Sequence, residues 1–445
     1  MDHLFPHRLS LWLGLIILAC SSVSAIADGP QAGLQAGVSK VDVTPPIGFA
    51  MWGYGARHDA PSVGVMDPLY AKALVLKVGK ESMAIVGLDI GRAPTRQSMA
   101  AIRKRVEAET GIKHLFIVGS HTHHGPVIEL DNWPTPQSSY VRTLEQKLAD
   151  VIIEAYRSLQ PAKLGIASKE VPLNRNRHSK RPDKSVDREL LVLRVESLDG
   201  KPIAHAVNFA AHPTMTVEKD MRFSADYPGV MAGVVEGQTK VPCLFLQGAA
   251  GDLSPNNVNF DWKPKPFGEA LGKEVLGMIK GIHCEESSKP LLQTYEADFR
   301  FKPRVDLGNP FVKQAFARAF FKDLVDFYDQ EYKDGCRPHL SVALLNGSIG
   351  FVGVSGEFFC RHSLDLKRRA RLDHVFFLGY CNDYQQYFPT IENASEGGYG
   401  ADPGVSTAEV GAGEQMMNAA LLQLYRMRGK YQDMPWEGTA LSQKT

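Results

Sequence analysis

The chain has 445 residues, of which 44% are hydrophobic, 22% are charged and 9% are aromatic, and its formal charge is +1. This composition is that of an ordinary globular protein with ample material for a core, in one large domain or two medium ones. The near-zero charge, without any polybasic run, argues against a nucleic-acid-binding surface.

The N-terminus has the three parts of a secretory signal peptide. Arg8 precedes the apolar run LSLWLGLIILAC, and small residues follow it, so cleavage after Ala25 or Ala27 is expected. The apolar run is well under the ~20 residues that a membrane-spanning helix needs. We therefore predict a signal peptide at 1–27 and an exported protein, periplasmic or secreted, without a transmembrane span in its mature chain. In the alternative, Cys20 would carry a lipid anchor.

Strand and helix patterns alternate along the mature chain, residues 28–430. Strands are predicted at 38–43, 69–78, 82–91, 115–120, 190–198, 203–212, 243–254, 340–359 and 375–383. Helices are predicted at 95–110, 139–159, 226–238, 267–282, 310–328, 361–372 and 408–427. No linker rich in proline, glycine or serine divides the chain. We therefore predict one α/β domain of mixed β-sheets flanked by helices, followed by a tail at 431–445.

The hexapeptide HTHHGP, residues 121–126, follows directly on a predicted buried strand. Sites collect at strand ends in α/β proteins, but surface loops also carry stray histidines. Metal chemistry, a proton relay and a solvated loop are therefore all open from the motif alone. A second apolar strand ends in His212, followed by Pro213. Two such strand ends could share a metal ion if the fold brought them to one sheet edge.

Polar groups also follow other predicted strands. Asp252 and Ser254 lie in the turn QGAAGDLSPN, which is either a simple Gly-Asp turn or the edge of a site. It is not a nucleophile elbow, because G-x-S-x-G is absent. Glu357 in GEFFCRHS would either favour a helix N-terminus or supply the anionic ligand that two neutral imidazoles need. Tyr384 and Tyr387, in a later loop, would on their own be packing residues.

Six motifs together resemble the neutral/alkaline ceramidase family. In chain order they are HTHHGP, NRNR, NFAAHPT, GDLSPN, GEFFCRHS and CNDYQQYFPT…GGYGA. The family's counterparts look like HTHSGP, NRSP, AxHPT, GDxSPN, PGEFxxxxGRR and NxYxxYxTT…YEGA. The resemblance runs from about Val38 to about Gly413 and implies the fold of that family's catalytic domain. Its C-terminal β-sandwich has no counterpart here, so we expect an amidase of this superfamily rather than a ceramidase proper.

The resemblance implies one catalytic Zn²⁺ and a role for each of eight residues. The zinc ligands would be His121, His212, Glu357 and Tyr387. Around the metal, His123 would transfer protons, Arg175 would hold the substrate near the reacting carbonyl, Tyr399 would face the developing oxyanion, and Ser254 would contact the substrate. Such donors suit zinc, which can lower the pKa of a bound water to ~7. His124 replaces the family's serine, and no role follows for it.

The expected activity is hydrolysis of an N-acyl amide bond in a small amphiphilic or N-acylated substrate, such as an N-acyl sphingosine, with peripheral membrane contact. Two alternatives stay open: a zinc-dependent ester or phosphoester hydrolase, and a non-catalytic exported ligand-binding protein. The metallo-β-lactamase pattern HxHxDH is excluded because Gly125 stands where that pattern requires aspartate. The five cysteines after Cys20 show no CxxC spacing, which argues against a cysteine zinc site and leaves at least one free thiol.

Overall fold

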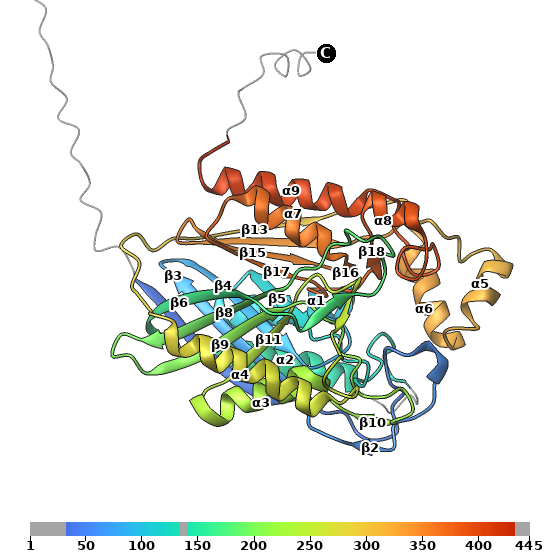
Figure 1. The fold of residues 1–445 in the computed structure, drawn as a ribbon, viewed down its shortest axis with the longest axis horizontal. Coiled ribbons are helices and arrows are strands. Elements are labelled where there is room, and N and C mark those ends of the chain that lie inside the picture. The colour runs from blue at the N-terminus through green and yellow to red at the C-terminus, as the bar shows by residue number, and fades with distance from the viewer. Residues whose placement is uncertain (1–32, 134–139, 432–445) are drawn as a thin grey trace, which may run out of the picture. The chain divides into compact units, whose positions relative to one another are not determined.

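The computed structural model describes residues 33–133 and 140–431, and in this part of the chain two β-sheets are stacked on each other (Figure 1). Among these residues, the larger sheet has eight strands in the order β11 (Cys243–Gln247), β9 (Pro202–Phe209), β8 (Glu189–Ser197), β6 (Gln160–Glu170), β1 (Leu34–Asp42), β3 (Tyr70–Val78), β4 (Glu81–Leu88) and β5 (His114–Gly119). The smaller sheet comprises β13 (Leu292–Asp298), β14 (His339–Leu345), β15 (Ile349–Val354) and β17 (His374–Leu378).

A buried apolar core joins the facing sides of the two sheets. It includes Leu74, Phe116 and Leu193 from the larger sheet and Phe351 and Phe376 from the smaller one. These side chains are at most 1% exposed. Burial of each such side chain stabilises the fold by about 1.5–3 kcal/mol, so the packing of sheet on sheet is a main source of stability.

Helices cover both outer faces, which gives four layers (Figure 1). The helices on the larger sheet are α1 (Arg96–Thr110), α2 (Tyr140–Arg157), α3 (Asp226–Thr239) and α4 (Pro264–Gly281). Those on the smaller sheet are α7 (Cys360–Ala370) and α9 (Ala412–Met427). Strands β4 and β5, β9 and β11, and β15 and β17 pair in parallel, whereas β1 and β3 pair antiparallel. The predicted fold class, mixed sheets flanked by helices, is confirmed.

The predicted helix at 310–328 is wrong. Two helices occupy this part of the chain, α5 (Pro310–Phe316) and α6 (Lys322–Tyr332), with an irregular segment between them. In a single helix the consecutive residues Phe320 and Phe321 would point about 100° apart. Here Phe321 stacks on Trp133, with ring centroids 5.2 Å apart, and Phe320 lies 6.3 Å from the ring of Tyr328. Packing of both aromatic rings therefore competes with the helical periodicity of the sequence.

Two long strands, β6 and β13, are not among the predicted elements. Strand β6 has Pro161 near its start and several exposed polar residues near its end, so it lacks the apolar alternation that marks a strand. In β13 five of the seven residues are only half-buried. Strand β6 is stabilised by hydrogen bonds to β1 and β8, and β13 by hydrogen bonds to β14. Pairing with these neighbours therefore compensates for the weak strand pattern in the sequences of β6 and β13.

Short ladders at the strand ends position the candidate site. Strand β16 (Glu357–Phe358) pairs in parallel with β18 (Tyr387–Phe388), so Glu357 lies opposite Tyr387. Strand β7 (Asn174–Asn176) pairs with β12 (Leu253–Pro255). The remaining short elements are β2 (Gly64–Val65), β10 (Arg222–Phe223), α8 (Ile391–Glu396) and the 3₁₀ helix η1 (Gly55–Arg57).

No helix within the described residues combines the length and the hydropathy needed to cross a membrane. The predicted signal peptide at 1–27, with Cys20, lies outside the described residues, as does the predicted tail beyond residue 431.

The five described cysteines, Cys243, Cys284, Cys336, Cys360 and Cys381, are all free thiols, and four of them are buried. The four buried thiols therefore pack in the interior as small side chains.

Candidate metal centre

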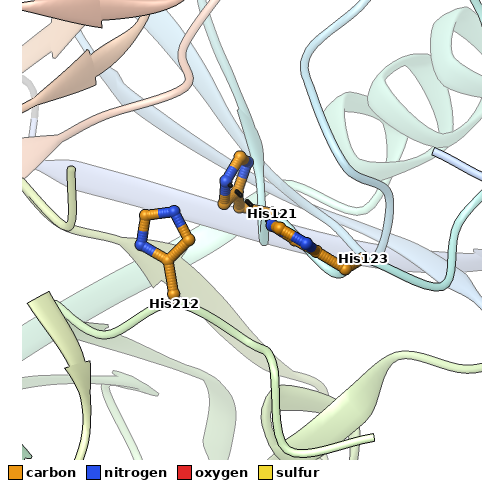
Figure 2. A group of neighbouring side chains, drawn as sticks. All are labelled: His121, His123 and His212. Atoms are coloured by element: carbon orange, nitrogen blue, oxygen red, sulfur yellow. Dashed lines mark hydrogen bonds between the residues drawn. The ribbon is translucent and has the colours of Figure 1, made fainter. Parts of the chain in front are cut away.

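Three histidines from two strand ends converge in the interior. His121 and His123 follow β5, and His212 follows β9 (Figure 2). One ring nitrogen of each lies within 4.8 Å of those of the other two, and all three side chains are buried. His121 has a positive φ of 69°, an uncommon conformation for a residue with a side chain. His121 adopts this conformation where the chain leaves β5, and its ring centroid lies 4.6 Å from that of His212.

Backbone carbonyls fix which ring nitrogen of His121 and His212 carries the proton. His121 Nδ1 lies 2.9 Å from the carbonyl oxygen of Gly91, and His212 Nδ1 lies 2.6 Å from that of Ala250. A carbonyl oxygen only accepts, so each Nδ1 donates its hydrogen, and each Nε2 carries a lone pair and acts as an acceptor. Such a contact from the far nitrogen is what orients histidine ligands in metal sites.

Both Nε2 atoms face one carboxylate oxygen. Glu357 Oε2 lies 3.3 Å from His121 Nε2 and 3.0 Å from His212 Nε2. Tyr384 donates a hydrogen bond to Oε1 at 2.5 Å, and Tyr380 donates to Oε2 at 3.4 Å. With both Nδ1 atoms protonated, neither Nε2 has a hydrogen to donate to Glu357 Oε2, and three facing acceptors are unfavourable unless a cation lies beside them, as the Arg177 guanidinium does at His212 Nε2. The donor set of two imidazoles and a carboxylate therefore fits a metal ion such as Zn²⁺.

The buried imidazoles of His123 and His212 are neutral near pH 7. Burial and the charge of Arg177 lower the pKa of His212 to about 3. Burial, followed by the neighbouring His121 and His212, lowers the pKa of His123 well below its usual value. His123 Nε2 lies only 3.4 Å from His121 Nε2. The geometry therefore places His123 within reach of the same ion, besides the proton-transfer role predicted for it.

Tyr387 completes the group of predicted ligands. Its hydroxyl lies 3.5 Å from His212 Nε2, and the two rings are nearly parallel, with an interplanar angle of 6°. Burial and the nearby Glu357 raise the pKa of this hydroxyl well above its usual value. Near pH 7 Tyr387 is therefore a neutral phenol. The structure brings together all four side chains predicted as ligands, from β16, β18 and the loops after β5 and β9.

The arginine beside these groups is Arg177, and Arg175 lies apart from them. Arg175 is exposed on β7, whereas Arg177 donates from Nη2 to His212 Nε2 at 2.8 Å and to the Tyr387 hydroxyl at 3.1 Å. A turn after β7 causes this difference. The side-chain oxygen of Asn176 accepts hydrogen bonds from the two backbone N–H groups that follow Arg177, and this turn redirects the chain. The motif NRNR contains both arginines, and nothing local distinguishes them.

A small pocket adjoins the cluster and has a volume of about 70 Å³. Its lining includes His121, His123, Glu357 and Tyr387. Residues 51–55 and residues between 319 and 328 also line it. The reactive groups therefore face a confined space lined largely by aromatic and aliphatic side chains.

Comparison with known proteins identifies the family. Residues 34–263, just over half of the chain, match the family model of the N-terminal region of neutral/alkaline non-lysosomal ceramidases. The chain belongs to the neutral/alkaline non-lysosomal ceramidase family. The resemblance inferred from the six motifs is thereby confirmed.

Two relatives in this family are from Dictyostelium discoideum. Neutral ceramidase B is 26% identical over 170 residues, which are 32% of this chain and 24% of that protein. Neutral ceramidase A is 26% identical over 171 residues, with the same coverage of 32% and 24%. The chain thus spans about a quarter of the length of these ceramidases.

Two solved ceramidase structures share the fold. The crystal structure of neutral ceramidase from Pseudomonas aeruginosa matches with a TM-score of 0.72 at 18% identity, covering 91% of this chain and 76% of that one. A ceramidase complexed with C2 matches with the same values. At this identity the likeness shows the architecture, and it extends beyond the region that the family model matches.

Two further residues singled out by the ceramidase motifs lie at the margin of the cluster. Tyr399 is 67% exposed and lines the pocket, with its ring 5.6 Å from that of Tyr387. Ser254 is buried on β12, opposite Arg175, and the carbonyl of its neighbour Leu253 lies 3.1 Å from His212 Nδ1. The observed contribution of this turn is thus to hold His212.

His124, the third histidine of HTHHGP, binds a different partner. Its Nε2 lies 2.6 Å from Arg57 Nη2, and Arg57 Nη1 donates to the carbonyl of His123 at 2.6 Å. Burial and the charge of Arg57 lower the pKa of His124 to about 4, so it is a neutral acceptor near pH 7. His124 therefore anchors the loop around η1 and has a structural explanation independent of the metal cluster.

The structure adds residues that no motif indicated. Glu129 is buried and accepts hydrogen bonds from Trp52 Nε1 at 2.9 Å, Arg92 Nη1 at 3.2 Å and the Tyr328 hydroxyl at 3.2 Å. Trp52 in turn packs its edge on His121, with ring centroids 5.0 Å apart. These residues come from four separate segments, so only the assembled fold shows that they support the cluster.

Proposed function

We propose that this member of the ceramidase family is an exported zinc-dependent amidohydrolase, which cleaves an N-acyl amide bond in a ceramide-like N-acyl sphingosine or a related N-acylated lipid or amine. The observation that carries the proposal is the position of Glu357 Oε2, within 3.3 Å of two Nε2 atoms whose imidazoles donate from Nδ1 elsewhere. The names of the related ceramidases support the amide as the bond cleaved. The leader at 1–27 supports export, and an amphiphilic substrate would entail peripheral contact with membranes.

One ion would be held by His121, His212, Glu357 and Tyr387. When bound, Zn²⁺ supplies a Lewis acid that lowers the pKa of a coordinated water to about 7 and polarises a carbonyl group. Tyr384 and Tyr380 orient Glu357 through their hydroxyl groups. These contacts hold the carboxylate towards the imidazoles, which is the orientation that ligation requires.

His123 is the group placed to move protons. It is neutral because burial lowers its pKa, and its Nε2 lies 3.4 Å from His121 Nε2, at the edge of the cluster. A neutral imidazole in this position can accept a proton from the attacking water and return it to the nitrogen of the leaving amine. The edge of Trp52 packs on the His123 ring, with centroids 5.9 Å apart, and so restricts its orientation.

Two residues would stabilise negative charge on the reacting carbonyl oxygen. Arg177 carries a fixed positive charge beside His212 and Tyr387, and its guanidinium can donate to that oxygen. Tyr399 lies at the exposed side of the pocket, with its ring 6.0 Å from the Arg177 guanidinium. Its hydroxyl could add a second donor once a substrate covers it. In this proposal Arg177 takes the substrate-holding role that the motif comparison gave to Arg175.

The test is hydrolysis of matched amides and esters by the purified mature protein, with its zinc content measured. We expect about one zinc per chain, hydrolysis of N-acyl amides, and loss of both activity and zinc in His121→Ala and Glu357→Ala. His283→Ala, which removes an exposed histidine, is the matched control. Turnover of esters or phosphoesters without amides would favour the alternative hydrolase. Protein without zinc, unaffected by both substitutions, would favour a non-catalytic ligand-binding protein.

A further inference from the structure

The imidazole of His123 is held differently from those of the other two histidines in the cluster. His121 and His212 each donate from Nδ1 to a backbone carbonyl, at 2.9 and 2.6 Å. The Nδ1 atom of His123 is buried and has no hydrogen-bond partner among the described residues. No contact with a backbone carbonyl therefore fixes the rotation of this ring, and its orientation depends on the groups packed around it.

One segment, residues 52–57, supplies these packing groups. Gly53 lies directly against the histidine, since a side-chain carbon at position 53 would be 2.5 Å from His123 Cγ. The Tyr54 ring packs on the His123 ring with centroids 4.7 Å apart and an interplanar angle of 71°. The Trp52 ring approaches the same imidazole at 5.9 Å. Close packing of this kind opposes rotation of the imidazole, because a turned ring would overlap with these neighbours.

Arg57 joins this segment to the loop that carries His123. It is 7% exposed, its Nη1 donates to the carbonyl oxygen of His123 at 2.6 Å, and its Nη2 lies 2.6 Å from His124 Nε2. Its Nε donates to the carbonyl oxygen of Glu218 at 2.8 Å. The guanidinium also lies 4.7 Å from the centre of the Tyr54 ring. Arg57 therefore holds both the backbone of His123 and the aromatic ring that packs on its imidazole.

We propose that Arg57 positions His123 for proton transfer, through the carbonyl of His123 and the ring of Tyr54. This inference rests on the proposed amide hydrolysis, in which His123 moves the protons. Tyr54 and His123 line the pocket and Arg57 does not, so the effect of Arg57 on the reaction passes through these two residues. His124, which replaces the serine of the family's motif, takes part as an acceptor for the same guanidinium.

The experiment measures kcat, KM and zinc content for Arg57→Met in the zinc-containing full mature chain, on one N-acyl amide. A misplacement of about 1 Å can cost about 10²-fold in rate, so we expect kcat to fall about 10–100-fold. KM and zinc content should stay unchanged, because substrate and metal are bound by other groups. Arg428→Met is the matched control, since Arg428 donates to the carbonyls of Ala370 and Arg371 at 3.1 Å each and does not line the pocket.

A double-mutant cycle distinguishes positioning of His123 from a general structural effect. If Arg57 acts through His123, Arg57→Met should lower kcat little further in a protein that already carries His123→Ala, because the positioned group is gone. If the two losses in kcat multiply in full, Arg57 acts independently of His123 and the inference is overturned. If Arg57→Met does not fold, Tyr54→Leu, which removes the ring packed on His123, decides by the same cycle.

A second measurement does not need turnover. In protein with ¹³C-labelled histidine rings, the NMR signal of His123 is assigned by its loss in His123→Ala. Arg57→Met should shift this signal, because the aromatic ring of Tyr54 alters the magnetic field at neighbouring nuclei, whereas Arg428→Met should leave it in place. An unmoved signal in Arg57→Met would overturn the inference and leave the amidase intact. Failure of the unaltered protein to hydrolyse N-acyl amides would overturn the proposed function, whatever the signal shows.

Discussion

The hydroxyl of Tyr384 donates a hydrogen bond to Glu357 Oε1 at 2.5 Å, while the other oxygen of the same carboxylate faces two imidazole nitrogens. The tyrosine therefore occupies one side of the carboxylate and turns the other towards His121 and His212. From the sequence alone Tyr384 was interpreted as a packing residue. Its position makes it a residue that orients a candidate metal ligand.

Replacement of this tyrosine should weaken zinc binding without unfolding the protein. Loss of a contact that orients a ligand typically costs 10–100-fold in metal affinity, and we expect this range for Tyr384→Phe. Competition with a chromogenic chelator measures it. Tyr425→Phe is the matched control, since it removes a hydroxyl that donates to Arg369 at 2.8 Å, away from the cluster. Equal zinc affinity of Tyr384→Phe and the unaltered protein would contradict this role.

The two arginines of NRNR should differ sharply in their effect on catalysis. Removing a donor that stabilises a developing oxyanion costs about 10²–10³-fold in kcat, and we expect at least the lower value for Arg177→Ala. The kcat of Arg175→Ala should stay close to that of the unaltered protein, because the Arg175 side chain is exposed. Steady-state kinetics on one N-acyl amide, with zinc content verified for both variants, makes the comparison. The reverse order of effects would restore Arg175 to the role first predicted for it.

Arg92 should be essential for stability, because it neutralises two buried carboxylates. It is 1% exposed and contacts Glu129 at 3.2 Å and Asp383 at 3.0 Å. Arg92→Met would leave both carboxylates buried without a cation, and breaking a buried ion pair costs about 3–5 kcal/mol. Denaturant unfolding measures the loss. Arg105→Met, which removes exposed ion pairs with Glu109 and Asp150, should cost no more than about 1 kcal/mol. Similar losses for the two variants would refute the argument.

Acid should destabilise the protein through His205, which is buried outside the metal cluster. Burial, followed by the charge of Arg194, lowers its pKa to about 4 in the folded state. In the unfolded chain its pKa is about 6.5. Between these values the unfolded chain binds more protons, so the free energy of unfolding falls as pH decreases from about 6.5 to about 4. Above pH 6.5 both states are neutral and this effect vanishes.

The contribution of His205 is measurable as a slope. One proton changes the free energy of unfolding by at most about 1.4 kcal/mol per pH unit, so His205→Gln should reduce the acid slope by up to that amount. Urea unfolding with excess chelator, at a series of pH values, separates this effect from metal release. The exposed His283→Gln should leave the slope unchanged. If the two variants behave alike, burial of His205 is not the source of the acid sensitivity.

Local patterns were sufficient for much of the architecture. Apolar runs predicted the central strands, and 3.6-residue periodicity predicted helices such as α2 and α4, because one face of each element is buried along its whole length. The same patterns failed for the helix at 310–328, where the packing of Phe321 on Trp133 and of Phe320 against Tyr328 competes with the helical periodicity. They also failed for β6, whose two ends are exposed, and for β13, most of whose residues are half-buried. In these cases contacts with distant segments outweigh the local preference.

For the candidate site, too, some features follow from the sequence and others only from the tertiary structure. The sequence by itself determined the residue types, since HTHHGP, HPT, GEF and the paired tyrosines carry the family's order of motifs. Only the tertiary structure decided which arginine joins them, that Tyr384 orients Glu357, that His124 binds Arg57, and that Phe320 and Leu324 line the pocket. The physical reason is that ligand types are local properties of the chain. Distances between side chains from separate segments are set only when the strands pair and the sheets pack.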